Sequence, residues 1–163
     1  MTIRSHQIKA TIALCAIISS TALANNNFPK GCEVSGFGYT GPYVILNDTQ
    51  DQTFYLIQNR SQGLIELERF ETRDVFMSPK LETKIAANQW AAFASDVSNI
   101  HFQCFYTLDN NRTPVNCSDV LDLCQYPRVK FALSNMGSYW VSTDKPLQQV
   151  IKDATAKGIY LKW

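Results

Sequence analysis

Cysteines are the first side chains in this sequence whose type and spacing could do chemistry. The chain contains five, and four of them lie beyond its N-terminal apolar segment, at Cys32, Cys104, Cys117 and Cys124. Zinc sites usually carry Cys-x-x-Cys pairs or paired histidines, and neither accompanies Cys117 and Cys124. An even number of cysteines in an exported chain instead predicts two disulfides, because the periplasm and the exterior are oxidising. We therefore expect no metal and no other cofactor.

The next candidate for a catalytic residue is His101, which is the only histidine after residue 24. Serine and aspartate are plentiful, so a Ser-His-Asp hydrolase of the cell envelope is one hypothesis. However, no Gly-x-Ser-x-Gly turn marks a nucleophile, and His101 lies on the polar side of an alternating stretch. We expect His101 to be a solvent-facing strand residue, and we expect no catalytic residue.

Acidic residues indicate no clearer site. Glu66 and Glu68 could be imagined as a glycosidase pair, but that reaction needs two carboxyl groups on either side of a cleft. They are two positions apart, which places both on one face of a strand and is typical of a solvated surface. Asp48 and Asp51 do not follow the spacing of an EF-hand calcium loop.

The N-terminal segment 1–24 predicts a secretory signal peptide. Arg4 and Lys9 give it a positive start, and an apolar stretch, Ala10–Ala24, ends in the small-x-small pattern Ala22-Leu23-Ala24. The stretch is shorter than the ~20 residues that span a bilayer, so we expect cleavage rather than an anchor. The expected localisation is therefore periplasmic or secreted.

Removal of this leader would leave 139 of the 163 residues, which is enough for one domain with a buried core. Two of the 15 basic residues would leave with it, so 13 would remain beside 14 acidic residues, a net charge of −1. A near-neutral chain lacks the positive potential of a nucleic-acid binder. No later stretch is long and apolar enough to predict a transmembrane segment.

Short alternating stretches between turn residues predict a mainly β fold. In Leu64–Phe70 the apolar Ile65 and Leu67 alternate with glutamates, and Asn99–Leu108 alternates in the same way. Many short strands with regular turns favour an antiparallel β-sandwich, Ig-like in general architecture, as a single domain over residues 25–163.

Two stretches need separate treatment. Ile85–Ala94 fits either a helix or a turn followed by a strand, and we favour the turn and strand because its neighbours look β. Near the C-terminus, Ser142-Thr143-Asp144 offers helix caps and Pro146 suits a first turn, which predicts one helix near 145–157. Ile159-Tyr160-Leu161 could return as a final strand.

The four cysteines allow three disulfide pairings. Asp109-Asn110-Asn111-Arg112 is a turn signal, and a hairpin centred between Asn110 and Asn111 would place Cys104 directly opposite Cys117. That pair would leave Cys32 for Cys124. Pro114 complicates the hairpin, because proline cannot donate a hydrogen bond to the neighbouring strand.

Aromatic side chains form 12% of the chain and mostly sit at alternating positions, which favours core packing. Tyr39 differs, because it lies in a glycine-rich stretch, Gly36–Pro42, that we expect to be a loop. We therefore take Tyr39 as the candidate for an exposed contact surface. Asn59-Arg60-Ser61 is one of four matches to the N-glycosylation pattern. In a eukaryotic secreted protein these sites could carry sugar, and in a bacterial envelope they usually indicate only polar turns.

The chain resembles the enhanced-entry protein B family of Legionella-type bacteria. The resemblance covers most of the chain after the leader and is weakest between Tyr39 and Lys80. It departs from the family at Ala87-Asn88-Gln89, where a glycine is expected in the turn. It rests on the early Gly31-Cys32, the spacing of the later cysteines, and the segments Ala87-Asn88-Gln89-Trp90, Gly137-Ser138-Tyr139-Trp140, Lys145-Pro146-Leu147 and Gly158-Ile159-Tyr160-Leu161.

The resemblance implies a role in entry into host cells and supplies no catalytic residues. We expect a secreted or periplasmic, non-catalytic protein that binds an envelope or host protein. The alternatives are a structural subunit of an envelope secretion complex and an envelope hydrolase that uses His101.

Overall fold

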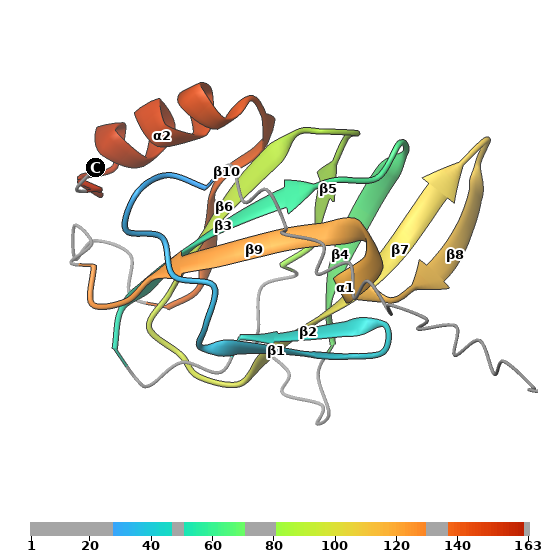
Figure 1. Ribbon diagram of the computed structural model, residues 1–163, viewed down its shortest axis with the longest axis horizontal. Helices are drawn as coiled ribbons and strands as arrows, with labels where there is room; N and C mark the ends of the chain where they lie inside the picture. Colours follow the sequence, from blue (N-terminus) through green and yellow to red (C-terminus); the bar gives the residue numbers. More distant parts are fainter. Residues whose placement is uncertain (1–27, 47–50, 71–80, 130–136, 162–163) are drawn as a thin grey trace, which may run out of the picture.

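The computed structural model describes residues 28–46, 51–70, 81–129 and 137–161 (Figure 1). The predicted signal peptide, residues 1–24, lies outside these ranges, as does Asp48. The fold is mainly β, with two antiparallel sheets, one C-terminal helix and two disulfides, so the predicted fold class is confirmed.

One sheet, called the outer sheet here, has the strand order β1-β2-β7-β4-β5, and β8 pairs with the far half of β7. Strand β7 is its centre, because β4 pairs along one edge while β2 and β8 share the other edge end to end. Its strands are β1 (Phe37–Thr40), β2 (Tyr43–Leu46), β4 (Leu64–Phe70), β5 (Thr83–Ile85), β7 (Ile100–Leu108) and β8 (Asn111–Val115).

The other sheet, called the inner sheet here, has the order β10-β6-β3-β9 and lies between the outer sheet and the helix α2 (Figure 1). A four-residue helical turn, α1, joins β8 to β9. These elements are β3 (Thr53–Asn59), β6 (Trp90–Ser95), α1 (Cys117–Val120), β9 (Leu121–Tyr126), β10 (Tyr139–Lys145) and α2 (Leu147–Ala156).

The core has two layers because the inner sheet is covered on both faces. Tyr55 and Ile57 of β3 pack between the sheets, while Phe54 and Leu56 of the same strand face the layer of α2. Strand β3 is therefore buried at nearly every position. A strand buried on both faces shows no period of two, which explains its continuous apolar character.

The structure confirms the prediction for Ile85–Ala94 and corrects part of the prediction for the C-terminal segment. Ile85–Ala94 is a turn followed by a strand, as expected, and Asn88 takes a φ of 59° in that turn. Near the C-terminus, Ser142-Thr143-Asp144 belongs to β10 and does not cap α2, whose N-cap is Pro146 without a side-chain hydrogen bond. The segment Ile159-Tyr160-Leu161 is not a strand. Ile159 packs into the core layer beside α2.

The glycine-rich stretch was also interpreted wrongly. Gly36–Pro42 contains strand β1 and the two-residue turn to β2, at which Gly41 has a φ of 57°. A positive φ suits glycine at such a turn, so the glycines here connect two strands rather than form an open loop.

Asn59 lies at the corner where the chain leaves the inner sheet for the outer sheet. Its side chain is fully buried, and its amide nitrogen donates to the carbonyl oxygens of Gly63 (2.7 Å) and Ile85 (2.8 Å). Its amide oxygen accepts from the backbone and the hydroxyl of Ser61 at 2.8 and 2.6 Å. All the hydrogen-bonding capacity of this amide is used inside the protein, so this copy of the glycosylation pattern cannot carry a sugar in the folded chain.

We predict that Asn59→Ala lowers the free energy of unfolding by about 3 kcal/mol, because two buried carbonyl groups lose their donors. Urea unfolding followed by circular dichroism measures the change. Asn111→Ala, at an exposed position of the β7–β8 hairpin, is the matched control and should leave the midpoint unchanged. Equal midpoints for both variants would show that Asn59 does not stabilise the corner.

Asp153 fastens α2 to β10. Its carboxylate accepts hydrogen bonds from Lys145 Nζ (2.7 Å), Ser142 Oγ (2.6 Å) and Gln149 Nε2 (2.9 Å). The hydrogen bond from Lys145 contributes most, followed by those from Ser142 and Gln149, and together they lower the pKa of Asp153 to about 2. The charged form is thus favoured in the folded state.

The sign of the resulting pH dependence follows from this lowered pKa. In the unfolded chain the pKa returns to about 3.8, so the stabilisation is complete above that value and is lost as the pH falls towards 2. We predict that Asp153→Asn costs about 1 kcal/mol at pH 7, because the carboxylate is partly exposed and screened. The difference from the unmodified protein should vanish near pH 2 when urea midpoints are compared. Asp109→Asn, at the exposed hairpin turn, is the control; a cost independent of pH would contradict this account.

Candidate functional site

Both disulfides have the expected partners, Cys32 with Cys124 and Cys104 with Cys117, at Cα–Cα distances of 5.5 and 5.4 Å. The expected hairpin register is nevertheless wrong. The turn lies at Asp109-Asn110, so Leu108 pairs with Asn111 and Cys104 lies opposite Val115. Cys117 begins α1, two residues further on, and reaches Cys104 from there.

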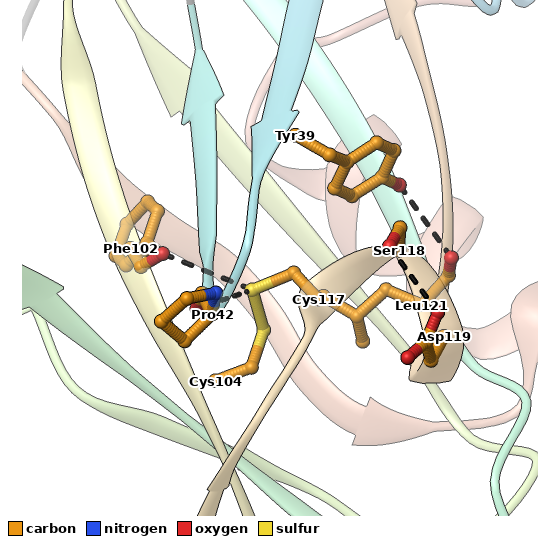
Figure 2. Close-up of a disulfide and its surroundings, with 8 residues drawn as sticks. All are labelled: Tyr39, Pro42, Phe102, Cys104, Cys117, Ser118, Asp119 and Leu121. Atoms are coloured by element: carbon orange, nitrogen blue, oxygen red, sulfur yellow. Dashed lines mark hydrogen bonds between the residues drawn. A yellow bond between two sulfur atoms is a disulfide. The ribbon is translucent and has the colours of Figure 1, made fainter.

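The Cys104–Cys117 bond ties three elements together (Figure 2). The turn between β1 and β2 lies against it, because the N–H of Cys104 donates to the Pro42 carbonyl (2.9 Å) and that of Cys117 to the Gly41 carbonyl (3.2 Å). Sγ of Cys117 lies 3.1 Å from the Pro42 oxygen, a contact rather than a hydrogen bond, since a disulfide sulfur carries no proton. Both cysteines are fully buried, so no thiolate is presented to a substrate and the bond is structural.

The second disulfide fixes the N-terminal strap, residues 28–36, to the inner sheet. Beside Cys32, the backbone of Glu33 exchanges two 2.8 Å hydrogen bonds with that of Gln125 in β9. Cys32 is half-buried and Cys124 is fully buried against the layer of α2. The strap therefore covers part of the inner sheet that would otherwise meet water.

We predict that the two disulfides contribute unequally to stability. Their sequence separations are 92 and 13 residues. Chain entropy assigns roughly 4.7 kcal/mol to a loop of about 100 residues and roughly 3 kcal/mol to one of about 15. Replacing Cys32 and Cys124 by alanine should thus lower the urea midpoint more than replacing Cys104 and Cys117. The reverse order would show that packing around the buried local bond outweighs chain entropy.

Tyr39, the predicted exposed contact, lies in β1 and is half-buried. Its ring packs against the core between the sheets, and its hydroxyl donates to the Leu121 carbonyl at 3.5 Å (Figure 2). Burial, with a smaller contribution from the charge of Asp122, raises the pKa of Tyr39 to about 12. The tyrosine is therefore neutral at physiological pH, and its hydroxyl can donate a hydrogen bond.

A small pocket of about 220 Å³ lies beside Tyr39, at the side of the sandwich where β1 and β9 are the outermost strands. We call it the edge pocket. Arg60 lies at it, 3.6 Å from the carboxylate of Asp122. Its apolar lining residues include Val34, Phe37, Tyr39, Leu121 and Leu123, and Arg60, Ser118 and Asp122 give the rest of its surface a polar character.

The solvent side of the outer sheet combines aromatic and charged side chains, and we call it the outer face. Across β7, the register places Ile45, His101 and Phe70 in one row and Tyr43, Gln103 and Glu68 in the next. The rings of Tyr43 and Phe70 are 5.0 Å apart, and Phe70 is 41% exposed. The outer face consists of Tyr43, Ile45, Glu66, Glu68, Phe70, Lys84, His101, Gln103, Phe105 and Arg112.

An ion-pair network occupies one end of the outer face. Glu66 accepts hydrogen bonds from Lys84 (3.1 Å), Thr107 (3.0 Å) and Arg112 (3.1 Å). Desolvation acts to raise the pKa of Glu66, but these hydrogen bonds outweigh it and hold the pKa below its usual value. The guanidinium of Arg112 also pairs with Glu68 and lies 3.3 Å above the ring of Phe105. Glu66 is thus a structural ion-pair centre and not one of two carboxyl groups flanking a cleft.

His101 lies on this face, as the alternation predicted, and is partly exposed. Its nearest neighbours across the strands are the apolar Ile45 and Phe70, and no hydrogen bond or ion pair reaches its imidazole from the residues that the structure describes. No carboxylate there orients the imidazole as a general base requires. Nor do the described residues gather three or more potential metal ligands.

Sequence reasoning missed the apolar half of the outer face. The signal was present, because the alternation of β4 places Phe70 on the same side as Glu66 and Glu68. A phenylalanine at a position expected to be polar indicates an exposed aromatic ring. The sequence does not show which side chains of Tyr43–Leu46 point to solvent, because that depends on how the neighbouring strands pair.

Comparison of the chain with protein-family models, with curated proteins and with solved structures gives no match. Neither helix in the described part of the chain is long and apolar enough to cross a membrane.

Proposed function

We propose that this chain is a non-catalytic periplasmic or secreted protein that binds an envelope or host protein through its outer face and thereby assists host-cell entry. The single observation that carries the binding role is the aromatic cluster of Tyr43 and Phe70 on the outer face, in which Phe70 is 41% exposed although it is a large apolar side chain. The role in entry follows only from the resemblance to the enhanced-entry protein B family.

The composition of the outer face supports a protein partner. Interfaces are enriched in aromatic residues and arginine at their centre and are polar at their rim. Here Tyr43, Ile45 and Phe70 provide apolar area, and the ion pairs between Glu66, Glu68 and Arg112 border it. The charges of this border are already paired, so an approaching protein need not compensate an isolated buried charge.

The rigidity of the scaffold supports the same role. The outer face is borne by β2, β4 and β7. The Cys104–Cys117 bond fixes β7 to α1, and the backbone N–H groups of both cysteines hold the turn that leads into β2. Residues on paired strands lose little further freedom when a partner binds, which lowers the entropic cost of association.

We predict that a photoreactive phenylalanine analogue at position 45 forms an adduct with a specific protein in intact cells. The double variant Tyr43→Ala, Phe70→Ala should lower the adduct yield by about tenfold or more, because central aromatic residues carry most of the binding energy of an interface. Mass spectrometry of the adduct identifies the partner.

The control is Val97→Ala, since Val97 is 49% exposed and lies outside the outer face. It should leave the adduct yield unchanged, and circular dichroism should show that all variants fold. An adduct of equal yield in the double variant, or no adduct at all, would remove the proposal. An adduct with a component of a secretion assembly would assign the chain to that complex instead.

A further inference from the structure

Strand β1 has one edge without a partner among the described residues. It pairs only with β2, through a two-residue turn, so Thr40 with Tyr43 and Gly38 with Ile45 form the hydrogen-bonded pairs. The same alternation follows from the turn residue that precedes β2, because the Pro42 carbonyl faces β7 and accepts from the N–H of Cys104. The N–H and C=O groups of Phe37 and Tyr39 therefore point away from the sheet.

Other outer strands have their edges covered or blocked. The edge of β9 is bridged by Glu33 of the strap. In β8, the residues whose backbone faces away from β7 are Arg112 and Pro114, and proline has no N–H to offer. On the opposite side, β5 and β10 lie together, and Asp144 of β10 accepts from the N–H of Ala86 at 2.7 Å. Strand β1 carries neither a proline nor a charge.

The edge pocket lies on the inward side of this free edge. Phe37 and Tyr39 of β1 form one wall, and Leu121 and Leu123 of β9 form another. A strand added beside β1 would direct alternate side chains towards the same side as Phe37 and Tyr39. One of those side chains would therefore point at the pocket.

From this arrangement we infer that β1 accepts an extended segment of a partner protein as an additional strand of the outer sheet, with one apolar side chain in the edge pocket. The backbone groups of Phe37 and Tyr39 supply the hydrogen bonds, and the pocket supplies selectivity, as in other cases of strand addition. An apolar cavity of about 150 Å³ holds benzene, so a pocket of about 220 Å³ admits one aromatic or branched aliphatic side chain. This inference rests on the proposed role in protein binding and names a mode for it.

The test uses peptides selected from a displayed random library against the purified protein. With the tightest peptide bound, the backbone amides of Phe37 and Tyr39 should exchange with deuterium at least about tenfold more slowly, as measured by NMR. The amides of Gly38 and Thr40 already bond to β2 and should change little. The selected peptides should share an apolar residue flanked by alternating positions.

A matched pair of variants isolates the pocket. Val34→Trp places a large ring at the pocket from a position that is 56% exposed, and Val97→Trp does the same at a position that is 49% exposed and distant in sequence from the pocket residues. Val34→Trp should weaken peptide binding by about tenfold or more, whereas Val97→Trp should not, and both should unfold at the same urea concentration.

Two results would overturn the inference. One is the failure to select any peptide that protects the amides of Phe37 and Tyr39, and the other is equal peptide binding by both tryptophan variants. The proposed function is judged separately by the adduct at position 45, so strand addition can fail while binding through the outer face stands. Conversely, if that adduct is not formed, the exchange rates of the Phe37 and Tyr39 amides still test strand addition on their own.

Discussion

The inner sheet presents apolar side chains on both faces, so water must be excluded from two surfaces at once. The outer sheet covers one of them, and its Ile65, Leu67 and Phe102 fill the space between the sheets. The second surface is covered by shorter pieces, namely α2, the strap and the segment after the helix, through residues such as Phe28, Val150 and Ile159. Each of these pieces is short, and a helix of ten residues is marginal in water without further contacts. This explains why the strap is held by a disulfide and α2 by the hydrogen bonds of Asp153.

The same constraint explains how much of the fold the sequence could reveal. Strands β4 and β7 have one wet face and one dry face, so their alternation identified both the strands and the side that each residue faces. Strand β9 is buried on both faces, and Leu121–Tyr126 shows no such alternation, so it was missed although it lies within the inner sheet. The turn at Asp109-Asn110 was placed one residue too far along. Local turn residues indicate that a hairpin exists, but the pairing of whole strands sets its register.

The candidate site was foreseen only in part, for a related reason. The disulfide partners followed from chain order and one hairpin, and they are correct even though the register is not. His101 was assigned to the solvent side correctly, since it lies in a strongly alternating strand. The outer face depends on side chains from β2, β4 and β7 meeting across strands, which only the sheet order determines. Tyr39 was expected to be exposed because its neighbours are glycines, whereas the pairing of β1 with β2 turns its ring towards the core.

The order of the disulfides along the chain has a consequence for biosynthesis. The bond between Cys32 and Cys124 encloses the one between Cys104 and Cys117, so neither cysteine of the outer pair joins its neighbour in sequence. A chain is made from its N-terminus, and Cys104 therefore becomes available to Cys32 before the correct partner does. Early oxidation would trap a bond that must later be exchanged, and isomerisation of such bonds is slow without a catalyst. In an oxidising compartment, a thiol–disulfide isomerase, or oxidation that waits for the complete chain, would remove the need for this slow exchange.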